Sequence, residues 1–309
     1  MKYLNIVNIK QNYYFRRIEN EKGKRIQKYI VRFGRNRPTL YSPKLLTGDA
    51  RTILKDKPAR SVGLVVTSPP YFMLKEAPWG GSYDDYQKIL NDIWKCCYDL
   101  LDNSCRLVIN IGDEQTSTEL YGRHKSIPIH ADIITGCENI GYDYMGTIIW
   151  VKARTMRSGG GGAILGSYPY PREFLPAYNY EYILIFKKPG RGNKPNDIIK
   201  ARSKVTKSDW KEWYNAIWTF PGEKKGFHSA PFPIELPERL IRVFSFMGDI
   251  VLDPFSGSGT TPLTAMRWGR KGIGIDINET YSKKAIGRIE QEKPGGKKHY
   301  DWVEEWEWK

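Results

Sequence analysis

Two short loops of the chain carry residues whose types and spacing point to chemistry. One is Thr-Ser-Pro-Pro-Tyr at residues 67–71, and the other is Asp-Pro-Phe-Ser-Gly-Ser-Gly at residues 253–259. Each comes directly after an apolar run of the kind that forms a buried strand. Open α/β sheets bind their ligands at the carboxyl ends of the strands. We therefore expect both loops to contact a cofactor or a substrate.

The loop at residues 253–259 fits a nucleoside cofactor. Its glycines let the backbone approach a ligand, and the helix expected after it leaves N–H groups free. The chain lacks the G-x-x-x-x-G-K-[ST] pattern of an NTPase loop, and Pro262 stands where a dinucleotide loop needs Gly or Ala. S-adenosyl-L-methionine fits better, with Asp276 ending the next strand and accepting hydrogen bonds from the ribose hydroxyls. A purely structural turn is the alternative.

The loop at residues 67–71 is suited to activate an exocyclic base amine. Such a nitrogen is a poor nucleophile until acceptors hold its hydrogens, and the Ser68 hydroxyl and the Pro69 carbonyl are acceptors. Pro70 has no N–H and a fixed φ, which keeps the Pro69 carbonyl out of local hydrogen bonds. Tyr71 offers a flat face for a base taken out of the duplex. A plain strand-closing turn with a packed Tyr is the alternative for this loop alone.

An α/β framework is needed to hold the loops. Residues 61–66 predict a buried strand, a helix capped by Asp84 and Asp85 follows and ends at Asn103, and residues 106–112 predict a second strand. These segments form one βαβ unit. The remaining predictions are short strands within residues 1–40, helices at 128–140, 236–246 and 261–268, and strands at 146–151, 182–186, 249–253 and 272–276.

The two loops, in this order, resemble those of the amino-methyltransferases of bacterial and archaeal DNA, in the permuted class whose catalytic loop precedes the cofactor loop. The resemblance covers about residues 44–285, apart from 187–226. It implies an α/β, Rossmann-like fold for S-adenosylmethionine-dependent methyl transfer, with a mostly parallel sheet, helices on both faces, an antiparallel hairpin at the end and a circularly permuted motif order.

The family's functional residues carry over to matching positions. Residues 68–71 (Ser68, Pro69, Pro70 and Tyr71) are the expected catalytic residues. Leu-Thr-Gly-Asp at 46–49 resembles the element whose carboxylate binds the adenine amino group. The segment from His228 resembles the one that encloses the methionine part. The expected cofactor-binding residues are Asp49, Ala230, Phe232, Pro233, Asp253, Phe255, Gly257, Gly259, Thr260 and Asp276.

The catalytic loop also bears on the target base. Ser68 in place of Asp biases the family towards N4 of cytosine, and N6 of adenine is the close alternative. We expect direct in-line transfer to a flipped base, in a restriction-modification context. A non-enzymatic DNA-binding protein is the alternative from another class, but it leaves both loops unexplained.

The charge of the chain points to a polyanionic partner. The net charge is +15, and it is concentrated in residues 1–40, with eleven Lys/Arg against two Glu, and in residues 187–226, with eleven against four acids. Both segments are rich in aromatic residues, which favours nucleic acid over a membrane surface or a merely solvated basic face. The expected DNA contacts are Arg154, Arg157, Lys187, Lys188, Arg191, Arg202 and Lys204.

These features predict five segments along the chain. Residues 1–40 form a basic extension, 41–186 the catalytic half, 187–226 a target-recognition insertion, 227–290 the cofactor-binding half and 291–309 a tail. Double-stranded DNA is the expected partner, with a cognate restriction endonuclease as a candidate, and the sequence does not decide between monomer and dimer.

Other chemistries lack the residues that they need. No cysteine follows a proline, as methylation at carbon 5 of cytosine requires, and the four histidines have no metal-ligand spacing, so no metal is expected. The four cysteines show no disulfide framework, and no segment has the length and apolarity of a membrane span. We expect a cytoplasmic, nucleoid-associated prokaryotic protein.

Overall fold

The protein is described by a computed structural model, whose chain falls into two units, Met1–Thr39 and Leu40–Lys309. The structure describes residues 13–18, 27–32, 40–73, 81–116, 121–152, 172, 176, 178–223, 232–291, 303–304 and 306–308. In the first unit, β1 (Tyr13–Ile18) pairs antiparallel with β2 (Gln27–Arg32). The short strands predicted for this part of the chain are thereby confirmed.

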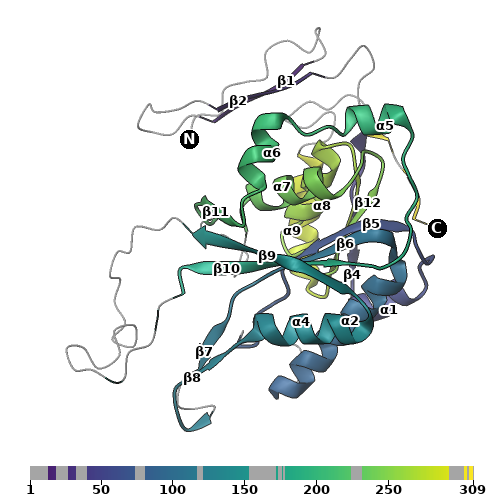
Figure 1. The fold of residues 1–309 in the computed structure, drawn as a ribbon. Helices are drawn as coiled ribbons and strands as arrows, with labels where there is room; N and C mark the ends of the chain where they lie inside the picture. Colours follow the sequence, from purple (N-terminus) through teal and green to yellow (C-terminus); the bar gives the residue numbers. More distant parts are fainter. Residues whose placement is uncertain are drawn as a thin grey trace. The chain divides into compact units, whose positions relative to one another are not determined.

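The second unit is built on an eight-stranded sheet with the order β11-β9-β10-β6-β5-β12-β13-β4 (Figure 1). Only β10 runs antiparallel to its two neighbours, and every other adjacent pair is parallel. In that order, the strands are Ile217–Phe220, Asp143–Lys152, Tyr180–Lys187, Leu101–Ile111, Val62–Thr67, Ile250–Asp253, Lys271–Asp276 and Lys44–Thr47. The mostly parallel sheet and the β9–β10 antiparallel hairpin confirm the expected fold class.

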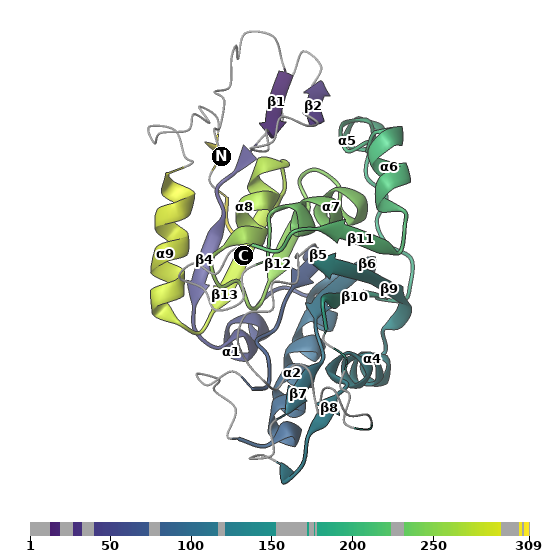
Figure 2. The ribbon, with the colours of Figure 1, turned by 90° about the vertical axis from the view of Figure 1, so that its left-hand side faces the viewer.

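Helices cover both faces of this sheet, as Figures 1 and 2 show. Side chains of α1, α2 and α4 contribute to the core on one face, and those of α6, α7 and α8 contribute to the core on the other. Helix α9 packs on α8 and β3 in a smaller cluster. The helices are α1 (Ala50–Lys55), α2 (Tyr83–Leu100), α4 (Ile129–Ile140), α5 (Asp197–Arg202), α6 (Lys207–Trp213), α7 (Glu235–Phe244), α8 (Thr260–Arg267) and α9 (Glu279–Glu290).

The first βαβ unit of this sheet forms as predicted, except that its helix has different ends and its second strand, predicted at residues 106–112, spans Leu101–Ile111. The N-cap of α2 is Ser82, whose hydroxyl oxygen accepts from the Asp85 N–H at 3.0 Å, so Asp84 and Asp85 lie in the first turn and are not caps. The helix ends at Leu100 and not at Asn103, because Leu101 already pairs with Val62 of β5.

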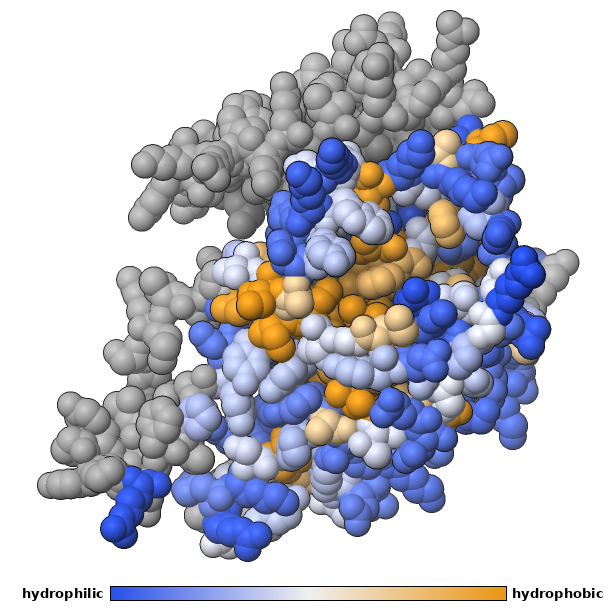
Figure 3. Space-filling view, viewed as in Figure 1, coloured by the Kyte–Doolittle hydropathy of each residue, from blue (hydrophilic) through white to orange (hydrophobic). Residues whose placement is uncertain are grey.

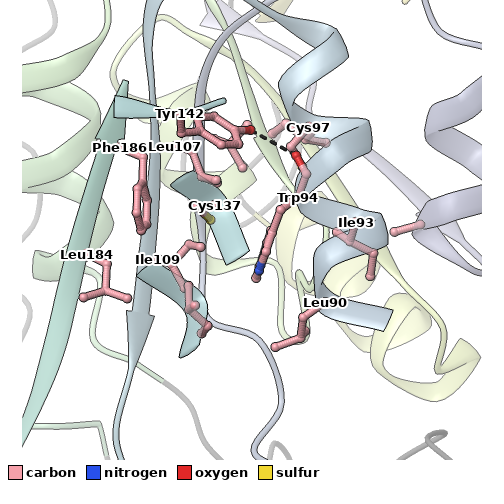
Figure 4. Close-up of a cluster of buried hydrophobic side chains, with 14 of the residues drawn as sticks. Leu90, Ile93, Trp94, Cys97, Leu107, Ile109, Cys137, Tyr142, Leu184 and Phe186 are labelled. Atoms are coloured by element: carbon pink, nitrogen blue, oxygen red, sulfur yellow. Dashed lines mark hydrogen bonds between the residues drawn. The ribbon is translucent and has the colours of Figure 1, made fainter. Parts of the chain in front are cut away.

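The core of the first face packs α2 and α4 against β6 and β10 (Figure 4). Trp94 and Cys97 of α2 are fully buried, and the Tyr142 hydroxyl donates to the Trp94 carbonyl at 3.1 Å. The other apolar side chains labelled there are Leu90, Ile93, Leu107, Ile109, Cys137, Leu184 and Phe186. Cys97 and Cys137 are therefore core residues, and all four cysteines are free thiols. This core fixes the strands on which the two loops stand.

The described part of the basic segment, residues 187–223, is integrated into the second unit. Its helices α5 and α6 are followed by β11, which pairs parallel with β9 and extends the main sheet by one strand. Trp213, Trp218 and Phe220 of this segment belong to the second core. The sequence did not predict β11, because the strand is only four residues long and the α/β alternation is lost in this segment.

Short strands also tie the two ends of the second unit together. The strand β14 (Val303–Glu304) pairs parallel with β3 (Leu40–Tyr41), and the Trp306 indole N–H donates to the Ser42 carbonyl at 2.8 Å. A further small hairpin joins β7 (Glu114–Thr116) to β8 (Lys125–Ile127). No helix in the described part of the chain is long and apolar enough to cross a bilayer.

Candidate active site

Both loops lie at one edge of the sheet. Strands β5, β12, β13 and β4 are neighbours and run in the same direction, so their carboxyl ends meet. Residues 67–71 follow β5, residues 253–259 follow β12, Asp276 ends β13, and Asp49 follows β4. The structure thus brings together the sequence-predicted residues of four separate segments.

A buried hydrogen bond joins the two loops. The Thr67 hydroxyl donates to Oδ1 of Asp253 at 2.6 Å, across adjacent strands. The same oxygen accepts from the Phe255 N–H at 3.1 Å. Burial raises the pKa of Asp253 to about 6, although the Thr67 hydrogen bond acts in the opposite direction. This hydrogen bond therefore fixes the position of one loop relative to the other.

The catalytic loop leaves its predicted acceptors available. The Pro70 carbonyl accepts from the Tyr86 hydroxyl at 3.2 Å, which holds the loop against α2. Neither the Ser68 hydroxyl nor the Pro69 carbonyl has a hydrogen-bond partner among the described residues. Ser68 is half-buried, so its hydroxyl lies near the surface of the edge. This arrangement suits two acceptors that serve a bound amine.

Tyr71 is held by a carboxylate that the sequence did not single out. Its hydroxyl donates to Oε1 of Glu181 at 2.7 Å, and the Asn110 amide donates to Oε2 at 2.6 Å. The Lys152 ammonium forms an ion pair with Glu181. Burial and, second, the Glu181 charge raise the pKa of Tyr71 well above its usual value. The only sequence signal was one acidic residue inside the apolar run of β10.

The cofactor loop has the backbone geometry of a ligand-binding turn. Gly257 and Gly259 have φ of 50° and 74°, in the left-handed region that favours glycine. Gly259 is the N-cap of α8 and provides no capping side chain, so the first N–H groups of that helix are open to a ligand. The Gly257 N–H donates to Oδ2 of Asp276 at 2.8 Å. From α9, Arg288 donates to the Ser258 carbonyl at 3.2 Å and braces the loop.

These residues fit S-adenosyl-L-methionine. Asp276 is half-buried, and each of its oxygens accepts one backbone N–H, from Gly257 and Asn278, which leaves lone pairs for ribose hydroxyls. The uncapped start of α8 suits the carboxylate of the methionine part. Phe255 is half-buried beside Trp94, with ring centroids 5.9 Å apart, and offers an apolar surface to adenine. The donors, acceptors and apolar face match the parts of this cofactor.

The other expected cofactor residues have different placements. Asp49 is the N-cap of α1, and its carboxylate is engaged by the backbone N–H and the guanidinium of Arg51, which lowers the pKa of Asp49. Thr260 is buried and accepts from Arg288 at 3.0 Å. Phe232 packs against the second core, and Pro233 is half-buried at the start of α7. Ala230 lies outside the described residues.

The expected DNA contacts divide into exposed and buried groups. Arg191, Arg202 and Lys204 are exposed and Lys187 is half-buried, whereas Arg154 and Arg157 lie outside the described residues. Figure 3 shows the side of the molecule that carries α5 and α6, where hydrophilic residues surround an apolar band. In the described residues, no group of acidic, His or Cys side chains is arranged to hold a metal.

The structure contradicts the prediction that Lys188 contacts DNA. The residue is only 8% exposed, and its ammonium donates to the carbonyls of Tyr98 and Leu101 at 2.6 and 2.8 Å. A buried cation held by two backbone oxygens has no reach to a phosphate. The charge count of the segment could not reveal which of its cations point inward.

Comparisons with known proteins place these features in a family. Residues 62–287 match the N6/N4 methyltransferase family, described as DNA methylase. A Type II methyltransferase of Methanocaldococcus jannaschii, M.MjaI, is 33% identical over 274 residues, covering 77% of this chain and 88% of its own length. A second Type II methyltransferase, M.MthZI of Methanothermobacter thermautotrophicus, is 29% identical and covers 77% and 73%.

Solved structures show the same architecture. A Thermus thermophilus protein described as a putative DNA modification methylase, solved in complex with S-adenosyl-L-methionine, is 39% identical with a TM-score of 0.69, covering 82% of this chain and 95% of that chain. The cytosine-N4-specific PvuII DNA methyltransferase is 20% identical with a TM-score of 0.60, covering 81% and 88%. At that identity, the PvuII structure supports the fold alone.

Proposed function

The chain belongs to the DNA methylase family, and from this membership we propose that it methylates the exocyclic N4 amine of cytosine in double-stranded DNA. It is a DNA methyltransferase whose cofactor is S-adenosyl-L-methionine. Two relatives are named Type II methyltransferases, which favours a restriction-modification context. The partner would then be a cognate restriction endonuclease, and both proteins would act in the cytoplasm.

The hydrogen bond between Thr67 and Asp253 carries this proposal. It is buried and 2.6 Å long, and it joins the loop that would bind the target base to the loop that would bind the cofactor. Methyl transfer needs both partners aligned, because approximation and orientation supply most of the acceleration. A fold that only bound DNA would have no need to couple these two loops.

The cofactor loop would hold the methyl donor. Asp276 would accept from the ribose hydroxyls, the open start of α8 would face the carboxylate, and Phe255 would contact adenine. When bound, S-adenosyl-L-methionine would supply an electrophilic methyl group for direct, in-line transfer, with S-adenosylhomocysteine as the leaving group and one amine proton lost to solvent. This direct transfer needs no nucleophile from the enzyme.

The catalytic loop would prepare the amine. The Ser68 hydroxyl and the Pro69 carbonyl accept hydrogen bonds from its two N–H groups and draw the nitrogen towards tetrahedral geometry. Tyr71 stacks on the ring of the flipped base. Tyr71 keeps its proton, because burial and the nearby Glu181 raise its pKa. A neutral hydroxyl at Ser68, where other members have a carboxylate, favours cytosine over adenine.

The DNA would lie against the basic surface of the second unit. Arg191, Arg202 and Lys204 are exposed; Arg191 precedes α5, Arg202 is its last residue, and Lys204 lies between α5 and α6. Cations at such positions neutralise phosphates, and only a few would read base edges. Base extrusion brings the target from this surface to the edge of the sheet.

Nucleoside analysis of methylated DNA tests the proposal. Unmethylated plasmid DNA is incubated with the protein and tritiated S-adenosyl-L-methionine, digested to nucleosides and separated by liquid chromatography with mass spectrometry. Label in N4-methylcytosine is the expected result. Label in N6-methyladenine would replace the proposed base by the alternative, and an unlabelled digest with several unrelated DNAs would contradict DNA methylation itself.

A further inference from the structure

One buried carboxylate lies beside the catalytic loop and gathers donors from three other elements. Glu181, the second residue of β10, is 7% exposed. It accepts from Tyr71 after β5, from Asn110 near the end of β6, and from Lys152 at the end of β9. Because β10 runs against its neighbours, its first residues lie at the same edge as the last residues of β6 and β9.

Stability of the fold does not explain this carboxylate. Ile183 and Ile185 follow at two-residue steps in β10, so they share its sheet face, and both pack in or against the second core. An apolar residue at position 181, with an apolar residue also in place of Lys152, would continue that row without the desolvation of a charge, and replacing both members of a buried ion pair by apolar groups is often neutral or stabilising. Of positions 181, 183 and 185, only position 181, which contacts Tyr71 of the catalytic loop, carries a carboxylate.

The contacts of Glu181 fix groups on both of its oxygens. Oε1 accepts the Tyr71 hydroxyl at 2.7 Å, and Oε2 accepts the Asn110 amide at 2.6 Å. Lys152, whose side chain is 34% exposed, forms an ion pair with Oε1. Gly112 leaves room for this arrangement, since a Cβ there would meet the Tyr71 hydroxyl at 3.2 Å and Glu181 at 3.4 Å. The tyrosine ring is therefore held from its far end.

We infer that Glu181 is a positioning residue, which holds the ring of Tyr71 in the orientation that the flipped target base stacks on. It acts through the Tyr71 hydroxyl, and it contacts neither the base nor the cofactor. This inference rests on the proposed function, because it gives Tyr71 its role as the stacking surface. Lys152 and Asn110 complete the set of donors that holds the carboxylate in place.

Two conservative variants and their combination test this role. Glu181→Gln keeps the size of the side chain but offers one acceptor oxygen and brings two amide hydrogens to a point where three donors converge. Tyr71→Phe keeps the stacking ring and removes only the hydroxyl. The single-turnover rate of methyl transfer is measured at saturating DNA and cofactor, with the DNA sequence identified from the methylated plasmid, and cofactor affinity is measured by calorimetry.

We expect Glu181→Gln to lower the transfer rate about 10-fold or more, with the cofactor dissociation constant near that of the unaltered protein. Tyr71→Phe should lower the rate as well. The double variant should be no slower than the slower single variant, because both changes break the same contact. A merely structural carboxylate would not couple to the Tyr71 hydroxyl in this way.

Glu138→Gln is the matched control, because Glu138 is exposed on α4 and lies outside the site, and its rate should equal that of the unaltered protein. An unchanged rate in Glu181→Gln would overturn the inference, as would rate losses that multiply in the double variant. Parallel losses of rate, cofactor affinity and melting temperature in Glu181→Gln, with Tyr71→Phe at full rate, would overturn it too. A failure of the proposed function is distinct, since the unaltered protein would then methylate no DNA.

Discussion

At the scale of single residues, the carboxylate of Asp253 is the most constrained group of the site. It is fully buried, and its pKa is raised from 3.8 to about 6, with burial as the main cause. An acid whose pKa is higher in the folded state stabilises the fold below its unfolded pKa, and this contribution is lost as the pH rises through the folded pKa. Ionised Asp253 is thus tolerated at neutral pH at some cost in stability.

Replacing Asp253 by Asn should remove this pH dependence. The amide oxygen of Asn can still accept from Thr67, and it does not ionise. Between about pH 4 and pH 7, the free energy of unfolding of Asp253→Asn should rise by about 2 kcal/mol relative to that of the unaltered protein. Urea denaturation at several pH values measures the difference, and two curves that stay parallel over this range would contradict the assigned pKa.

Ser68 offers the sharpest test of the chemistry. Ser68→Ala removes one acceptor of the target amine and leaves the backbone and the cofactor loop unchanged. The loss of one hydrogen bond made to the reacting group should lower the single-turnover rate by about 10- to 100-fold. Calorimetric titration should give an unchanged affinity for S-adenosyl-L-methionine. Equal losses of transfer and of cofactor binding would contradict the role given to Ser68.

The sequence revealed the residues of the loops but few of their partners. Residues 68–71, Asp253 and Asp276 could be found because they stand in short, recognisable strings. Glu181 could not, because it comes from an antiparallel strand whose place beside β6 depends on long-range pairing. The engagement of Asp49 by Arg51 was also hidden, since a helix N-cap and a ligand-binding carboxylate have the same sequence appearance.

At the scale of elements, Lys188 connects the start of the basic segment to the end of α2. Its ammonium donates to the carbonyls of Tyr98 and Leu101, which lie where the helix leaves its last carbonyls without helical partners. Desolvation lowers the pKa of Lys188, as expected for a buried cation. This lysine thus belongs to the framework of β10 and α2.

Lys188→Met should therefore weaken the fold and spare DNA binding. The change keeps most of the side-chain volume and leaves two buried carbonyls without their donor, so the free energy of unfolding should fall by about 1 to 3 kcal/mol. The neighbouring Lys187→Met is the control, with an expected change within about 0.5 kcal/mol. Denaturant unfolding and DNA titration of both variants give the comparison, and a stable Lys188→Met with weakened DNA binding would reverse the assignment.

Elements with strong patterns were predictable, and those defined by pairing were not. The apolar run of β5 and the periodic apolar positions of α2 gave both elements to within a few residues, and the glycine loop marked the start of α8. The short β11 escaped, because its four residues carry no alternation beyond Trp218 and Phe220. Its identity as a strand comes from its pairing with β9, which local sequence does not encode.

At the scale of the whole molecule, the net charge of +15 should dominate the affinity for DNA. Each phosphate contact releases counterions, so the logarithm of the association constant falls linearly with the logarithm of the salt concentration. If Arg191, Arg202 and Lys204 each contact a phosphate, replacing all three by Ala should reduce the steepness of that line by about 3. The basic residues of the first unit stay in place, so a salt dependence should remain.

Fluorescence anisotropy with a labelled duplex between about 50 and 200 mM salt measures this slope. Replacing Lys95 by Ala removes one exposed cation of α2, outside both basic segments, and should leave the slope unaltered. An undiminished slope in the triple variant would show that Arg191, Arg202 and Lys204 do not face the phosphates.

The pairing of β14 with β3 brings the two ends of the second unit side by side, with Val303 next to Leu40. A short peptide joining these ends, together with a new opening in a distant surface loop, would rearrange the gene and leave every strand of the sheet where it is. Such a permutation can reverse the order of the two loops in the sequence. Such a rearrangement would keep the hydrogen bond between Thr67 and Asp253, whichever of the two residues comes first in the chain.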